Sequence, residues 1–172
     1  MENKDYFEGI LQLRNPNDEV VEHIRDSVEK KKNCFISKEE KVRGGIDFYF
    51  SSQRFLQSFG RKLHNSFGGN IKTSAKIHTR DKQKSKDVYR VNVLIYLPDF
   101  KRRDIIFIDN RIIKVLKIGK SLTGFDIMKN KATTINYQNK KTTLIDVYET
   151  EVTKVFPALE VLHPETFQSV VV

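Results

Sequence analysis

The stretch Ile71-Lys72-Thr73-Ser74-Ala75-Lys76-Ile77-His78-Thr79-Arg80 decides the fold of the first half of this chain. Its odd-numbered positions carry Ile, Thr or Ala, whereas its even-numbered positions carry Lys, Ser, His or Arg. Because successive side chains of a strand point to opposite faces, the pattern predicts a strand with one core face and one cationic face. A polar segment over 81–87 connects it to a second alternating run over 89–95, so the two runs predict a hairpin with a basic tip.

Two strands, each followed by a helix, are expected before this hairpin. After the first alternating run, Asn15-Pro16-Asn17-Asp18-Glu19 supplies an N-cap, a proline for the first helical position and acids for the first turn. Gly44-Gly45 opens the second strand, and Ser51-Ser52 offers the cap of a second amphipathic helix that Gly68-Gly69 ends. The order strand, helix, strand, helix, hairpin predicts an α+β sandwich, with two helices on one face of a mixed sheet.

Helical periodicity ends at Pro98. Beyond it, short apolar runs are separated by turn-forming clusters such as Asp109-Asn110-Arg111 and Asn139-Lys140-Lys141. Several short strands in about 75 residues predict a small all-β barrel of the SH3-like or OB-like kind. We therefore expect two domains, an α+β domain over residues 1–97 and a small β-barrel over residues 98–172.

Basic side chains are concentrated between Arg61 and Arg103. This stretch has 12 Lys and Arg residues against three acidic ones, an excess that equals the formal net charge of +9 of the whole chain. Because a Lys or Arg beside a phosphate releases a condensed counterion, the stretch favours nucleic-acid binding, although basic loops also serve solubility alone. Charged residues make up 31% of the chain and no apolar run approaches the ~20 residues of a spanning helix, so we expect a soluble, cytoplasmic protein without membrane contact.

Residue types that carry catalysis or bind metals do not cluster in the sequence. Cys34 is the only cysteine, which excludes an intramolecular disulfide and a Cys-pair zinc site. The four histidines lie far apart without the spacing of metal ligands, and no glycine-rich phosphate loop or nucleophile motif occurs. We therefore expect no catalytic residue, no metal, no cofactor and no small-molecule substrate.

Three runs carry a family resemblance: Gly45-Ile46-Asp47-Phe48-Tyr49-Phe50-Ser51, Val93-Leu94-Ile95-Tyr96-Leu97-Pro98 leading into Asp104-Ile105-Ile106, and His163-Pro164-Glu165-Thr166-Phe167-Gln168. In this order they resemble the nonsense-mediated-decay-protein-three family in its archaeal type; eukaryotic members are export adaptors of the large ribosomal subunit. The resemblance implies an α+β domain similar to a large-subunit ribosomal protein of the L22e type. It also implies a following SH3-like barrel similar to part of the hypusine-bearing translation factor.

Some features of that family have no counterpart in this sequence. The family's N-terminal zinc-binding region is built from Cys-x-x-Cys pairs, and its eukaryotic members carry a long C-terminal tail with a nuclear-export signal. The functions of the zinc region and export activity are therefore not assigned to this chain. Lys129-Asn130-Lys131 does not match the lysine loop that is modified to hypusine, so that modification is not expected either.

Charge and resemblance together predict a non-enzymatic protein that binds the large ribosomal subunit during its maturation or quality control, through rRNA and ribosomal proteins. Phosphate contact is expected from basic side chains of the hairpin and the domain junction: Lys72, Lys76, His78, Arg80, Lys82, Lys84, Lys86, Arg90, Lys101, Arg102 and Arg103. Tyr89 and Tyr96 offer stacking, but both are expected to pack within the sheet. The alternative is a protein-interaction module whose barrel binds a ribosomal protein or peptide. A third hypothesis is an RNA-modifying enzyme, which would need a pocket lined by convergent polar groups.

Overall fold

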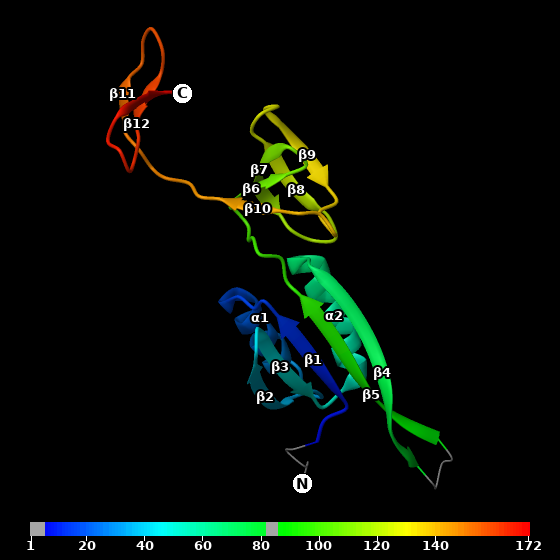
Figure 1. Ribbon diagram of the computed structural model, residues 1–172. Helices are drawn as coiled ribbons and strands as arrows, with labels where there is room; N and C mark the ends of the chain where they lie inside the picture. Colours follow the sequence, from blue (N-terminus) through cyan, green and yellow to red (C-terminus); the bar gives the residue numbers. More distant parts are fainter. Residues whose placement is uncertain (1–5, 82–85) are drawn as a thin grey trace.

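The first seven elements of the chain form an α+β module around one sheet, which we call the first module (Figure 1). The computed structural model describes residues 6–81 and 86–172, and the α+β class predicted from the sequence is confirmed. The elements are β1 (Gly9–Arg14), α1 (Asp18–Glu29), β2 (Ile36–Val42), β3 (Gly45–Phe50), α2 (Gln53–Phe67), β4 (Asn70–Asp81) and β5 (Lys86–Tyr96). Their sheet has the order β2-β3-β1-β5-β4, with β1 parallel to β5 and the other neighbours antiparallel.

Both helices begin at capping side chains. The N-cap of α1 is Asn17, whose side chain accepts a hydrogen bond from the Val20 backbone N–H at 2.9 Å, so Pro16 precedes the cap and does not occupy the first helical position. Asn15 instead has a φ of 54°, and its side-chain amide donates to Asp99 Oδ1 at 2.8 Å. Ser52 caps α2, and Gly68 ends it with a φ of 73°, as predicted.

The core of the first module lies between its helices and one face of its sheet. The strands contribute Leu11, Leu13, Phe48, Phe50, Val91, Val93 and Ile95. The helices contribute Val20, Val21, Ile24, Val28, Leu56, Phe59 and Leu63. Gly60 allows close contact between α2 and β5, because a Cβ there would lie 2.7 Å from a methyl group of Val93.

The prediction that one face of β4 packs into the core is largely wrong. Ile71 packs against the core, but Thr73, Ala75 and Ile77 are exposed. The reason is the position of β4 at the edge of the sheet, where its far half extends with β5 as a hairpin beyond the helices (Figure 1). Alternation along an edge strand therefore distinguishes its two faces without showing which residues are buried.

A second sheet follows, with its own core. Its strands are β6 (Ile105–Ile108), β7 (Arg111–Lys117), β8 (Leu122–Asp126), β9 (Lys131–Ile135) and β10 (Thr143–Ile145), all antiparallel in the order β10-β6-β7-β8-β9. The core consists of Phe100, Ile106, Ile108, Ile113, Val115, Leu122, Ile135 and Tyr137. We call residues 98–145 the second module.

The C-terminal residues form a separate three-stranded sheet, which we call the third sheet. Its strands are β11 (Val152–Lys154), β12 (Glu160–Leu162) and β13 (Ser169–Val171), in the order β11-β12-β13. The sheet of the second module is open, with β9 and β10 at its edges, and the last three strands join a different sheet, so the strands of residues 98–172 do not form one sheet. The SH3-like form of this part of the chain stays a prediction. The runs of apolar residues predicted strands but did not specify which strands pair.

A buried tyrosine connects the first and second modules. The Tyr137 hydroxyl accepts a hydrogen bond from the Gly69 backbone N–H at 2.7 Å and donates one to the Gly119 carbonyl at 2.8 Å. Its ring packs edge-on against Phe100, with the ring centres 5.5 Å apart. The division of the chain into domains at residue 97 stays a prediction.

Candidate nucleic-acid interface

One face of the first sheet is covered by none of the described elements, and we call it the open face. Since Val91, Val93 and Ile95 point into the core, the alternate β5 residues point to this face: Arg90, Asn92, Leu94 and Tyr96. The register of β4 adds two lysines, because Lys72 lies opposite Leu94 and Lys76 lies opposite Arg90. β1 contributes residues on the other side of β5, where Ile10 pairs with Asn92 and Gln12 pairs with Leu94.

Arg90 is held in place on the open face by an aromatic ring. Its guanidinium carbon lies 3.9 Å from the centre of the Phe7 ring, a cation–π contact. Phe7 in turn packs edge-on against Tyr49, with the ring centres 4.9 Å apart. Arg90 Nε is buried and has no hydrogen-bond partner among the described residues. This stacking fixes the orientation of the guanidinium plane.

Cations on the other half of the open face are already paired. Arg14 Nη1 lies 2.6 Å from Asp47 Oδ1, and Lys38 Nζ lies 3.0 Å from Glu40 Oε2. Hydrogen bonds from Lys38 and from the Tyr49 hydroxyl hold the pKa of Glu40 below its ordinary value. By contrast, Lys72 and Lys76 are exposed and form no ion pair with a described carboxylate. The uncompensated positive charge of the open face therefore lies on the β4–β5 side.

Three of the predicted site residues, Lys72, Lys76 and Arg90, come together on the open face. Lys82 and Lys84 lie outside the described residues, and the side chains of His78, Arg80 and Lys86 lie outside the described part of the chain as well. The remaining predicted residues, Lys101, Arg102 and Arg103, are exposed in the turn that opens the second module.

The cations of the junction turn lie in a different place from the open face. Lys101 and Arg102 line a groove with residues from the start of α1 and the end of α2, which are on the helix side of the first sheet. The turn is fixed by hydrogen bonds from the Lys101 N–H to Asp104 Oδ2 at 2.8 Å and from the Arg103 N–H to the Val115 carbonyl at 2.9 Å. The described members of the predicted site thus form two clusters rather than one surface.

A comparison with known protein families identifies the segment that carries the open face. A family model described as NMD3, second domain, matches residues 6–97, more than half of the chain. The chain belongs to the NMD3 family. The resemblance stated from the sequence is thereby confirmed, and the matched segment contains the whole open face. No curated protein matches the chain.

The NMD3 family is a family of ribosome-associated adaptors, and it is associated with the large ribosomal subunit. Its members are not known as enzymes.

None of the described residues form a group of three or more His, Cys, Asp or Glu side chains that could hold a metal ion. Within residues 6–81 and 86–172, neither helix is long and apolar enough to cross a membrane. Cys34 is buried, and burial raises the pKa of its thiol.

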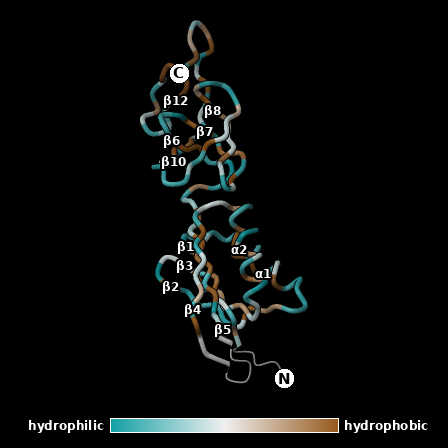
Figure 2. The backbone as a smooth tube through the Cα atoms, turned by 90° about the vertical axis from the view of Figure 1, so that its right-hand side faces the viewer, coloured by the Kyte–Doolittle hydropathy of each residue, from teal (hydrophilic) through white to brown (hydrophobic). Residues whose placement is uncertain are grey.

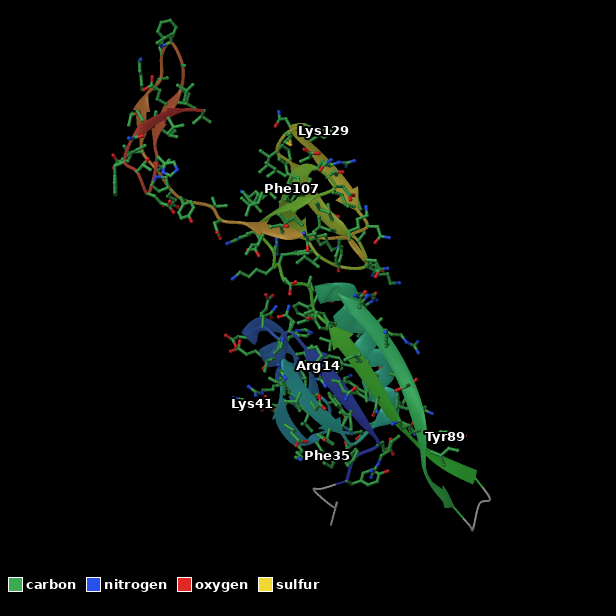
Figure 3. The ribbon with its side chains drawn as sticks, viewed as in Figure 1. Arg14, Phe35, Lys41, Tyr89, Phe107 and Lys129 are labelled. Carbon is green, nitrogen blue, oxygen red and sulfur yellow. The ribbon has the colours of Figure 1, made fainter. Side chains whose placement is uncertain are left out.

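Sequence reasoning missed the exposure of two tyrosines in this NMD3-family chain. Tyr96 is 52% exposed on the open face, and Tyr89 is 44% exposed where the hairpin extends past the helices (Figure 3). The expectation that both pack within the sheet is wrong. β5 alternates as predicted, but none of the described elements covers the open face over Tyr96, and α2 does not reach Tyr89. An exposed aromatic ring beside cations is suited to stacking on an unpaired base.

Proposed function

We propose that this NMD3-family chain is a non-enzymatic adaptor that binds the large ribosomal subunit through rRNA phosphates during subunit maturation or quality control. The observation that supports this proposal best is the open face, where exposed Lys72 and Lys76 have no described carboxylate partner. A broad surface with uncompensated positive charge binds a phosphate backbone without needing a pocket.

The side chains of the open face differ in what they offer RNA. Lys72 and Lys76 are flexible point charges four residues apart on one face of β4, a span of about 13 Å along the strand. Arg90 presents a guanidinium already oriented by Phe7, which lowers the entropy lost when it binds a phosphate. Tyr96 adds a stacking surface. Affinity should therefore depend on RNA shape and charge more than on base identity.

Co-sedimentation with purified large and small ribosomal subunits at several salt concentrations tests this proposal. Each phosphate contact contributes roughly −0.7 to −0.9 to the slope of log K against log salt, so Lys72→Gln with Lys76→Gln should flatten the slope by about 1.5. The matched control is Lys30→Gln with Lys31→Gln, an equal change at two exposed lysines at the end of α1. Equal slopes for both variants, or no preference for the large subunit, would contradict the proposal.

A second candidate function, protein contact, is favoured by the third sheet. Val152, Val161 and Val170 lie opposite one another across its three strands and therefore share one face. The other face carries the Lys154–Glu160 ion pair, with 3.2 Å between Nζ and Oε1, and a hydrogen bond between the Thr153 and Ser169 hydroxyls. No residue of this sheet is buried in the described structure.

Further apolar side chains are exposed in the segments that join the three strands. Val155, Phe156 and Phe167 are 75%, 83% and 73% exposed, and hydrophobic positions recur along this segment in Figure 2. Three-stranded sheets of this size become stable by packing an apolar face against something else. We propose that the valine face contacts a protein of the large ribosomal subunit, in addition to the RNA contacts of the open face.

A further inference from the structure

A groove of about 410 Å³ lies where the first and second modules meet. Its walls come from the start of α1, the end of α2, the segment after β5 and the end of β7. This volume falls in the range of sites that hold a small organic molecule or a single nucleotide. The proposed phosphate contacts of the open face do not use this groove, since it lies on the helix side of the first sheet.

The groove has a cationic rim. Lys101, Arg102 and Lys117 line it, all three are exposed, and none forms an ion pair with a described carboxylate. Two hydrogen bonds from backbone N–H groups hold the turn that carries Lys101 and Arg102, so the backbone places both residues beside the groove before any ligand binds. Three cations beside one small groove complement a phosphate group.

Apolar side chains line the groove as well. Phe67 is half-buried at the end of α2, and Leu116 is 44% exposed near the end of β7. An apolar surface next to phosphate-binding cations is suited to a nucleotide, whose base is flat and apolar on its faces and whose phosphate is charged. A duplex cannot use such a site, because its bases are stacked inside the helix.

The Glu19 carboxylate favours a ligand that donates hydrogen bonds. It lines the groove from the first turn of α1 and is exposed. An ionised carboxylate only accepts hydrogen bonds. Among the bases, guanine presents two adjacent N–H donors on its Watson–Crick edge, which match the two oxygens of a carboxylate. Uracil has a single N–H donor there, and adenine and cytosine each have one amino group.

We propose that this groove binds an unpaired guanosine nucleotide of RNA, with its base against Phe67 and Leu116, its Watson–Crick edge at Glu19 and its phosphate at the Lys101, Arg102 and Lys117 rim. The proposal rests on RNA binding by this chain and adds selectivity for an unpaired base to phosphate contacts that are indifferent to sequence. An acidic peptide with an apolar side chain is the competing occupant.

Titration of the whole chain with short RNA hairpins tests the proposal. The probes are one fully paired hairpin and four otherwise identical hairpins that carry a single bulged G, A, C or U. The bulged-G hairpin should bind about tenfold more tightly than the paired hairpin, a difference of about 1.4 kcal/mol. Leu116→Trp, which fills the groove, should abolish this preference and leave affinity for the paired hairpin within twofold.

Matched variants separate an effect of filling the groove from other effects of the substitutions. Leu144→Trp adds the same ring at a residue of β10 that is 52% exposed and does not line the groove, and it should keep the preference. Ser66→Trp fills the groove from α2 and serves if Leu116→Trp fails to fold. Glu19→Gln should reduce the discrimination between G and A, whereas Glu22→Gln, outside the groove lining, should not.

Each contrary outcome has a distinct meaning. If the paired and bulged hairpins bind equally, the groove proposal is overturned while phosphate binding by the open face stands. If none of the hairpins binds, the proposed RNA-binding function fails and the groove proposal fails with it. If an acidic peptide binds, Leu116→Trp abolishes that binding and the bulged hairpin does not compete, the occupant is a peptide and the guanosine proposal is overturned.

Discussion

The hydroxyl of Tyr137 accepts a hydrogen bond from the backbone N–H of Gly69, 68 residues earlier in the chain, at a distance of 2.7 Å. Tyr137 belongs to the core of the second module, and Gly69 lies between α2 and β4 of the first. The same hydroxyl donates to the Gly119 carbonyl, so its hydrogen-bonding capacity is used on both sides of the junction. Phe67 and Ile118 line the groove that we propose, and they lie beside Gly68 and Gly119 in the chain, so this contact lies next to two residues of the groove.

Tyr137→Phe should lower the free energy of unfolding by about 1–3 kcal/mol, because it leaves the Gly69 N–H and the Gly119 carbonyl buried without this partner. Urea unfolding followed by circular dichroism measures the change. Tyr148→Phe is the matched control, since Tyr148 is 59% exposed and should change stability by less than about 0.5 kcal/mol. An equal effect of both substitutions would show that the junction hydrogen bonds contribute nothing.

The stability of the junction should also fall at high pH. Burial raises the pKa of Tyr137 above the ordinary value of about 10. Because the folded pKa is the higher one, the neutral hydroxyl stabilises the fold fully below the unfolded-state pKa. That stability is lost as pH rises from about 10 through the folded-state pKa. The difference in unfolding free energy between the parent and Tyr137→Phe should therefore shrink above pH ~10, and a constant difference would contradict this account.

Gly69→Ala should destabilise the protein more than Gly44→Ala does. Both glycines have positive φ, 85° at Gly69 and 74° at Gly44, so both substitutions bear a similar backbone cost of about 1 kcal/mol. A Cβ at Gly69 would also collide with the Tyr96 carbonyl oxygen, whereas nothing lies within 4 Å of one at Gly44. Thermal unfolding of the two variants isolates this collision, and equal shifts in Tm would show that the backbone relaxes around it.

The fold was predictable where local patterns determine structure. Apolar stripes predicted both helices, and Ser52 and Gly68 marked the ends of the second. β2 was missed because its residues, Ile-Ser-Lys-Glu-Glu-Lys-Val, carry charges on both sides of an edge strand and bury none of them fully. The pairing of strands beyond Pro98 was not predictable either. Pairing depends on contacts between residues far apart in sequence, which periodicity does not record.

The candidate site was predictable only in part, for the same reason. Alternation over 71–80 placed Lys72 and Lys76 on one face, and the register of β4 with β5 brings Arg90 to that face. The separation of Lys101 and Arg102 from this cluster follows from the path of the chain across the junction. Lys117 and Glu19 join those two residues only through the packing of α1 and β7 around the groove. No spacing in the sequence indicates that contact.

The valine face of the third sheet should contribute a salt-insensitive part of large-subunit binding. Burying one valine side chain stabilises a complex by about 1.5–3 kcal/mol, and this apolar term does not depend on counterion release. Val170→Ser should therefore weaken binding by roughly tenfold or more at every salt concentration, without changing the slope of log K against log salt. Co-sedimentation with purified large subunits at moderate and high salt measures both quantities.

Val171→Ser is the control for that experiment, because Val171 is the next residue on β13, lies opposite Glu160 on the polar face and is 63% exposed. It removes the same atoms from the same strand, so any loss of sheet stability should be similar in both variants. Equal binding by Val170→Ser and Val171→Ser would remove the support for protein contact through the valine face. A change of slope with Val170→Ser alone would mean that the third sheet positions cations on RNA, because only ionic contacts alter the salt dependence.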